Sequence, residues 1–355
     1  MKLAQTSSNI IARLDRDGWL RAWTALPESR RSAFLHPDFV IASARWEDGE
    51  GECLQIVDGD RSLLYPYVRH AIPGASDESF DIQTAYGYGG PLFVGEWDHA
   101  SRVDALRDVG QHLAERGGVA EFVRCHERWT DFDALRDAGY ATPVVRTNVT
   151  SDLSAEPIPA SWASNVRRNL KRAMGVGLRW RLGTTADDLE SFIRIYTMTV
   201  ARLDMAASYR FDDDYFRSLF AMSRPLTQFV LVENSNGATV AGALVIHGGE
   251  LAHYHLGGSN LAHQADRPND LLYLGMAEAA RSAGCRYMAW GGGLSTDPAD
   301  TLLRFKSGFG QIKTPARIGC RVLNATGYQS LVSDWELRNP ERAATCKMFL
   351  RYRAA

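Results

Sequence analysis

The chain has 355 residues, of which 45% are hydrophobic and 23% charged, and its formal net charge is −2. This charge argues against a protein that coats nucleic acid along its length, because non-specific binding needs many phosphate contacts. No apolar run approaches the roughly 20 residues of a membrane-spanning helix, and the first residues meet charge too early for a signal peptide, so we expect a cytoplasmic protein. Five scattered cysteines lack C-x-x-C spacing, which predicts reduced thiols and no structural zinc site.

The first half of the chain alternates short helical and strand patterns. Helices are expected within 19–46, and two strands within 52–72 are expected to form a hairpin that turns at Asp58-Gly59-Asp60. After the tyrosine- and glycine-rich stretch AYGYGGPL (85–92), further elements are expected in the order helix, strand, helix, strand at 103–117, 120–125, 132–139 and 143–153. This half therefore predicts a mixed α/β unit that ends near residue 155.

The same order of elements then starts again. Residues 154–162 have the proline and small-residue content of a linker. Helices are expected at about 160–174, 188–204, 213–222 and 269–284, and strands at 178–183, 228–234, 238–249, 250–259 and 285–293. The doubled pattern predicts two related α/β units in tandem, one over 1–155 and one over 156–355.

A basic helix opens the second unit. WASNVRRNLKRAM (162–174) has an apolar stripe, and the other faces carry Arg167, Arg168, Lys171 and Arg172 as i, i+4 pairs. Four cations in six residues form either a patch that attracts phosphate or an ordinary solvated face.

Two groups of aromatic or titratable residues are further candidates for a site. Tyrosines and an arginine gather near glycines, either as the edge of a core or as a cleft that orients a polar substrate; these are Tyr65, Tyr67, Arg69, Tyr86 and Tyr88. His253 and His255 alternate on one expected strand, and because no third ligand lies nearby, we expect no metal site.

The stretch LLRFKSGFGQ (302–311) places Lys306 between two phenylalanines. An ammonium group is costly to bury unless it is paired or used. Lys306 is therefore either a surface residue with a buried stem or part of a site. We expect Gly308 and Gly310 to let the backbone turn beside it.

Several motifs, in this order, resemble the Fem-type aminoacyltransferases and their FemAB-like relatives over about residues 35–325. They are LLYPYVRHAIP, DIQTAYGYGGPL, NVRRNLKRA, HYHLGGSN and LLRFKSGFG. The resemblance implies two tandem GNAT-like α/β domains, each a mixed β-sheet flanked by helices, with a cleft between them. It implies transfer of an aminoacyl group from aminoacyl-tRNA to the amine of a peptide, peptidoglycan-precursor or nucleoside-antibiotic acceptor, with no cofactor and no DNA partner.

The resemblance also implies roles for particular residues. Phe305 and Lys306 match the family's Phe-Lys motif, whose lysine stabilises the charge that develops at the reacting ester, an effect of a few kcal/mol in size. Phe305 is a candidate to stack on the terminal adenine of the tRNA, and a role in the core is equally open to it. The remaining candidates for substrate binding are Tyr67, Arg69, Tyr86, Tyr88, Arg168, Arg172, Arg202, Tyr209, Arg210, Tyr215 and His255.

Two alternatives remain. One is an N-acyltransferase of a polysaccharide, lipid or secondary-metabolite pathway that uses acyl-coenzyme A. GNAT enzymes hold the pyrophosphate of that donor in a turn of the form [QR]-x-x-G-x-[GA]. Here Asp270 and Leu272 fill both glycine positions, and Asn269 or Asp270 suits the N-cap of the following helix better, which disfavours coenzyme A. The other alternative is a FemAB-like protein that binds a glycan or peptide without catalysis.

Overall fold

The computed structural model describes residues 10–72, 74–75, 78–222, 226–297 and 299–354. Its internal contacts divide the chain into two compact units. Unit 1 comprises the chain up to Ala25, Ser43–Pro143 and the chain from Arg317 onward; unit 2 comprises Leu26–Ala42 and Val144–Ala316. The units are thus discontinuous, unlike the division into 1–155 and 156–355 that the sequence suggests, because each exchanges a segment with the other half of the chain.

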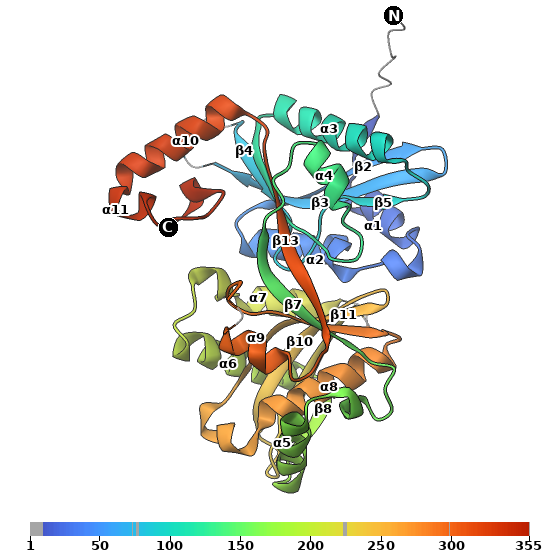
Figure 1. Cartoon of the computed structure of the whole chain (residues 1–355), viewed down its shortest axis with the longest axis vertical. Helices are drawn as coiled ribbons and strands as arrows, with labels where there is room; N and C mark the ends of the chain where they lie inside the picture. The colour runs from blue at the N-terminus through green and yellow to red at the C-terminus, as the bar shows by residue number, and fades with distance from the viewer. Residues whose placement is uncertain (1–9, 73, 76–77, 223–225, 298, 355) are drawn as a thin grey trace, which may run out of the picture. The chain divides into compact units, whose positions relative to one another are not determined.

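Unit 1 is a mixed sheet with helices against it (Figure 1). Its strands lie in the order β1 (Ile11–Arg13), β2 (Glu50–Asp58), β3 (Arg61–Ala71), β4 (Phe80–Gln83), β6 (Gly118–Arg124) and β13 (Ile312–Val322), and β5 (Leu92–Val94) pairs with β3. Strand β13 begins in unit 2 and ends in unit 1. Neighbours are antiparallel except for β4 and β6, which are parallel. The expected hairpin is confirmed, since β2 and β3 pair up to Asp58 and Arg61 and Gly59 has φ +58°.

The helices of unit 1 include a pair that covers its apolar core. Residues of α3 and α4 pack with the inner residues of β2, β3, β4 and β6 in one cluster. The helices are α1 (Arg16–Thr24), α3 (His99–Glu115), α4 (Phe132–Asp137), α10 (Ala325–Arg338) and α11 (Pro340–Ala343), while α2 (Pro37–Trp46) begins in unit 2 and ends in unit 1.

Unit 2 repeats the mixed sheet. Its strands lie in the order β7 (Val144–Asp152), β12 (Tyr287–Gly292), β11 (Leu251–Ser259), β10 (Thr239–Gly248), β9 (Thr227–Glu233) and β8 (Arg179–Gly183). Only β11 and β12 form a parallel pair among these strands. Its helices are α5 (Ser164–Gly175), α6 (Ala186–Arg202), α7 (Asp213–Ala221), α8 (Pro268–Ser282) and α9 (Thr301–Lys306). The alternation of helices and strands expected for this part of the chain is confirmed.

Helices cover both faces of the unit 2 sheet. On β9, Phe229 packs against Phe192 of α6, with ring centroids 4.9 Å apart, while its neighbour Val230 packs against Gly275 of α8. Successive residues of a strand point to opposite faces. Helices α6 and α8 therefore lie on opposite sides of the sheet.

The parallel strands β11 and β12 pair over only part of their length. Pairing ends at His253 and Ala289, although the strands continue to Ser259 and Gly292. Each strand also carries an extra residue where its register with the next strand shifts, His255 in β11 and Trp290 in β12. Such bulges bend a strand, so β11 and β12 form a fork beyond their paired ends.

Candidate functional site

Helix α9 brings Lys306 to this fork. The carboxylate of Asp300 caps the helix by accepting from the backbone N–H of Leu303 at 2.9 Å, and it also accepts from the N–H groups of Leu294 and Ser295 at 2.6 and 3.1 Å. One carboxylate thus holds both the loop after β12 and the start of α9. Lys306 is the last residue of the helix, and only 8% of it is exposed.

The ammonium group of Lys306 lies close to both arms of the fork. Nζ donates to the carbonyl oxygen of Gly292, the last residue of β12, at 2.9 Å. It also lies 5.8 Å from the ring centroid of Tyr254, the first residue of β11 beyond the paired segment. The interpretation of Lys306 as a surface residue is therefore wrong, because its charged end is buried inside unit 2.

Burial makes this lysine unusual in its chemistry. Loss of solvent, and after it the positive charge of Arg146, lowers the pKa of Lys306 to about 8, while the negative charge of Asp300 opposes both effects. At neutral pH the side chain is still mostly an ammonium. This ammonium group is desolvated and donates to one carbonyl oxygen. Such a cation is suited to stabilise negative charge that develops on a substrate.

Aromatic rings surround Lys306 and keep its environment apolar. Tyr273 of α8 is the centre of this group, with ring centroids 4.2 Å from Phe309, 4.7 Å from Trp290, 5.3 Å from Phe305 and 5.6 Å from Tyr254. Phe305 packs its ring against this core and remains 37% exposed. Both interpretations of Phe305 stay possible, since it contributes to the core and also shows part of its ring to solvent.

The glycines after Lys306 allow close packing. Neither Gly308 nor Gly310 has a positive φ. A Cβ added to Gly310 would lie 2.5 Å from the carbonyl oxygen of Thr150 on β7, and one added to Gly308 would lie 2.9 Å from Val166. The expectation of a turn that needs glycine is corrected: these positions need glycine because β7 and α5 approach the backbone.

The N-terminus of α8 carries a buried acid. The N-cap is Arg267, at φ 63°, with Pro268 as the first helical residue, so the predicted N-cap role of Asn269 or Asp270 is wrong. Asp270 is 4% exposed and accepts a hydrogen bond from Asn169 of α5 at 3.0 Å. Burial raises the pKa of Asp270, against the effects of Asn169 and Arg267.

Helix α5 presents its cations to solvent. Val166, Leu170 and Ala173 are buried as the stripe predicts, whereas Met174 is 51% exposed. Arg167 donates to the carbonyl oxygen of Trp162, which fixes the start of the helix. In the described part of the chain no ion pair neutralises the three other cations, which are Arg168, Lys171 and Arg172.

Tyr215, which is buried, and His255, which is partly exposed, form a pair. Their Oη and Nε2 atoms lie 2.8 Å apart, and rings of Phe34, Phe39 and Phe211 pack around His255. Burial lowers the pKa of His255 to about 3, so the imidazole is neutral. Tyr215 is only 2% exposed. Tyr215 therefore belongs to the apolar interior, whereas His255 remains partly exposed.

The other candidates of unit 2 lie at the end of α6 and beyond it. Arg202 is the exposed last residue of α6. The carbonyl oxygen of Tyr209 accepts from Tyr196, and Arg210 lies 3.9 Å from Asp204. No contact of these residues with Lys306 is found within the described ranges.

The candidates of unit 1 divide into buried and half-buried residues. Tyr67 is fully buried and donates a hydrogen bond to Glu52 at 2.8 Å. Glu52 is also paired with Arg13 and Arg116. The predicted substrate-binding role of Tyr67 is therefore corrected to a role in the core. Three others remain partly exposed. Arg69 lies over the ring of Phe80, Tyr86 lies under Arg124, and Tyr88 packs against His126.

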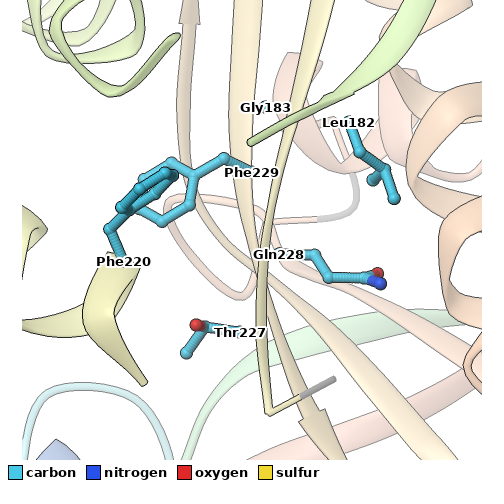
Figure 2. Close-up of a pocket in the computed structure, with 6 residues that line it drawn as sticks. All are labelled: Leu182, Gly183, Phe220, Thr227, Gln228 and Phe229. Atoms are coloured by element: carbon cyan, nitrogen blue, oxygen red, sulfur yellow. The ribbon is translucent and has the colours of Figure 1, made fainter. Parts of the chain in front are cut away.

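A small hollow near the β8 edge of the unit 2 sheet is lined by no titratable side chain. Its volume of about 10 Å³ is enough for one water molecule. Figure 2 shows Phe220 of α7 beside Phe229, with Gln228 pointing to the other side of β9. None of its lining residues is titratable, and two strands, β10 and β11, separate β9 from β12, so this hollow is not the site.

The described residues contain no group of three or more His, Cys, Asp or Glu side chains that could hold a metal ion. Over the same residues, no helix is both long and apolar enough to cross a membrane.

Comparison with known proteins defines the class first. Residues 160–306 match the family model described as an acetyltransferase (GNAT) domain. This segment holds the fork, α8 and α9, so the part of unit 2 that contains Lys306 is similar to a GNAT acetyltransferase domain. The predicted fold class of α/β units of GNAT type is confirmed. No curated protein matches the sequence significantly.

Several solved structures have a similar architecture. The crystal structure of FemX is similar with a TM-score of 0.71 at 12% identity, over 90% of this chain and 99% of that one. L-PGS from Bacillus licheniformis gives 0.58 at 12% identity, over 85% and 90% of the two chains. The C-terminal domain of a putative lysylphosphatidylglycerol synthetase from Agrobacterium fabrum gives 0.57 at 14% identity, over 92% and 97%. The resemblance to the Fem-type family is thus confirmed at the level of the fold.

Lys306 and its surroundings show what the sequence alone missed. Three residues near Lys306 were not candidates. The ring of Tyr254 lies close to its ammonium group, Tyr273 is the centre of the surrounding aromatic group, and the charge of Arg146 acts on its pKa. The alternation in HYHLGGSN places Tyr254 on the face opposite the two histidines. That alternation was the available signal for Tyr254; no comparable pattern points to Arg146.

Proposed function

We propose that this protein transfers an aminoacyl group from aminoacyl-tRNA to an amine, and that Lys306 stabilises the oxyanion of the reaction. The observation that carries the proposal is the buried ammonium of Lys306 at the fork of β11 and β12. The likeness in fold to FemX, to L-PGS and to a putative lysylphosphatidylglycerol synthetase supports aminoacyl transfer over other acyl transfers.

The amine nitrogen attacks the ester carbonyl carbon, and a C–N bond forms while the carbonyl oxygen becomes an oxyanion. Lys306 then donates a hydrogen bond to this oxygen in an apolar site, where a fixed donor contributes about 3–4 kcal/mol. Collapse of the intermediate breaks the C–O bond. The ribose hydroxyl leaves with a proton, which originates from the attacking amine. Lys306 holds its own proton throughout.

Asp270 argues against acyl-coenzyme A as the donor. A GNAT pyrophosphate would bind at the N-terminus of the helix that follows the first strand of the fork, here α8. The buried carboxylate of Asp270 lies in the first turn of that helix and is held there by Asn169. A negative charge at this position repels pyrophosphate. The acetyltransferase description of the matching family model keeps acyl-coenzyme A as the second candidate donor.

The acceptor is proposed to be a small amine of the peptide, peptidoglycan-precursor or nucleoside type. Arg168 and Arg172 on α5 are exposed, and no described residue forms an ion pair with them, so they are suited to phosphate groups of either substrate. Half-buried Tyr86 and Tyr88 supply hydroxyl groups in unit 1.

A transfer assay tests the proposal. The protein is incubated with a mixture of charged tRNAs and a panel of amine acceptors, and the products are identified by mass spectrometry. Amide products that need charged tRNA support the proposal. Products that form instead with acetyl-coenzyme A support the second candidate, and absence of any product favours a binding protein without catalysis.

A further inference from the structure

Arg146 lies directly beside the site of Lys306. It belongs to β7, two residues before Asn148, which pairs with Gly292. The stem of Arg146 crosses this glycine so closely that an added Cβ on Gly292 would lie 2.6 Å from Cδ and 2.8 Å from Cγ. The absence of a side chain at residue 292 therefore makes room for Arg146.

The same glycine binds the other cation. Its carbonyl oxygen accepts from Nζ of Lys306 at 2.9 Å, and an added Cβ on Gly291 would lie 3.4 Å from that nitrogen. Gly291 has φ +73°, a conformation that favours glycine. Because residues 291 and 292 are both glycines, the side chains of Arg146 and Lys306 can both approach this short stretch of backbone.

Within the ranges that the structure describes, no carboxylate pairs directly with either cation. Asp300 is the acid whose charge acts on Lys306, and its carboxylate already accepts from the backbone N–H groups of Leu294, Ser295 and Leu303. Among the described residues the guanidinium of Arg146 has neither a carboxylate nor a hydrogen-bond partner, and the residue is exposed. Arg146 also depresses the pKa of Lys306, which shows that the two charges repel one another.

We propose that Arg146 and Lys306 together bind one end of the donor substrate, with Arg146 holding a phosphate of its terminal nucleotide while Lys306 faces the ester carbonyl. A guanidinium presents a planar fork of donors that matches phosphate oxygens. An anion between the two cations also removes their repulsion. The proposal rests on the proposed function, because it takes the donor to be a nucleotide ester.

Binding of two stable donor analogues tests the proposal. One is 3′-aminoacylamido-3′-deoxyadenosine and the other is the same compound with a 5′-phosphate; calorimetry gives Kd for each. In the wild-type protein the phosphate is expected to tighten binding by about tenfold, as a charged hydrogen bond does. Arg146→Gln should abolish this gain, Arg146→Lys should keep part of it, and Arg179→Gln, a change of another exposed arginine of unit 2, should keep all of it.

The outcomes separate the two hypotheses. A phosphate gain that persists in Arg146→Gln, or no gain in the wild type, overturns the role of Arg146 and leaves the donor class intact. If neither analogue binds, the proposed function fails, and inorganic pyrophosphate becomes the probe. Saturable pyrophosphate binding that Arg146→Gln abolishes then supports an anion site of another origin; absence of such binding overturns the site itself.

Discussion

The ammonium of Lys306 donates to the carbonyl oxygen of Gly292 at 2.9 Å, and this contact fixes a buried cation at the open end of a parallel strand pair. Both residues depend on distant parts of the chain for their positions. Asp300 caps the helix of Lys306, and β7 holds the backbone of Gly292. The site is therefore a product of the fold of unit 2 and not of the Phe-Lys dipeptide alone.

The rate of transfer should fall as pH rises through about 8. Burial lowers the pKa of Lys306 from its ordinary value to about 8, so the ammonium is present below this pH and is lost above it. Because the proposed role needs the charged form, kcat/KM measured between pH 6.5 and 10 should show a decline with an apparent pKa near 8. A profile that stays flat up to pH 10 would show that the charge of Lys306 is not required.

Asp270→Asn should permit binding of coenzyme A that the wild-type protein lacks. The substitution removes the negative charge at the start of α8 and keeps a side chain that can bond to Asn169. Calorimetry with coenzyme A at neutral pH measures the difference. Micromolar binding by the wild type would contradict the exclusion of this donor, and an unchanged affinity in Asp270→Asn would show that the carboxylate is not its cause.

Arg321→Met should destabilise unit 1 strongly. Nε of Arg321 donates to the buried carboxylate of Glu121 at 2.5 Å, and Tyr65 and Tyr140 each donate to the same carboxylate at 2.9 Å. Removal of the arginine leaves a buried negative charge without its counterion, which costs about 3–5 kcal/mol. Urea unfolding gives the loss, with the exposed Arg338→Met as the control. A loss below about 1 kcal/mol would fit a surface ion pair instead.

Gly310→Ala should destabilise unit 2, whereas Gly175→Ala should not. A Cβ at residue 310 would meet the backbone of Thr150 at 2.5 Å, which can be relieved only by a shift of β7 or of the chain after α9, at a cost of about 1–3 kcal/mol. Gly175 is the last residue of α5, and an added Cβ there meets nothing within 4 Å. Thermal unfolding of both variants measures the contrast. Equal melting temperatures would mean that the approach of β7 is looser than described.

Local patterns predicted the elements of this fold better than their assembly. Gly59 marks the β2–β3 turn, and the apolar periodicity of 269–284 matches α8 closely. The exchange of segments between the units could not be predicted, because β13 pairs with β6 across about two hundred residues and no local pattern specifies such a partner. The expected single boundary near residue 155 failed for this reason.

The candidate site was predictable only in part. Lys306 stands out in the sequence because a cation in an apolar stretch needs an explanation. Tyr67 was a candidate for its hydroxyl group, and it proved to be buried because Glu52 on the neighbouring strand accepts its hydrogen bond. Arg146 was missed because the residue that places it, Gly292, lies far away in sequence and carries no side chain.

The central claim is the role of Lys306 in transfer, and single-turnover transfer from charged tRNA measures it most directly. Lys306→Met removes the cation and keeps an apolar side chain of similar length, whereas Lys313→Met changes an exposed lysine of the same unit. The account predicts that Lys306→Met slows transfer by about 100- to 1,000-fold, the effect of losing one oxyanion donor, with the fold unchanged by circular dichroism and Lys313→Met near the wild-type rate. Transfer by Lys306→Met at the wild-type rate would contradict the account.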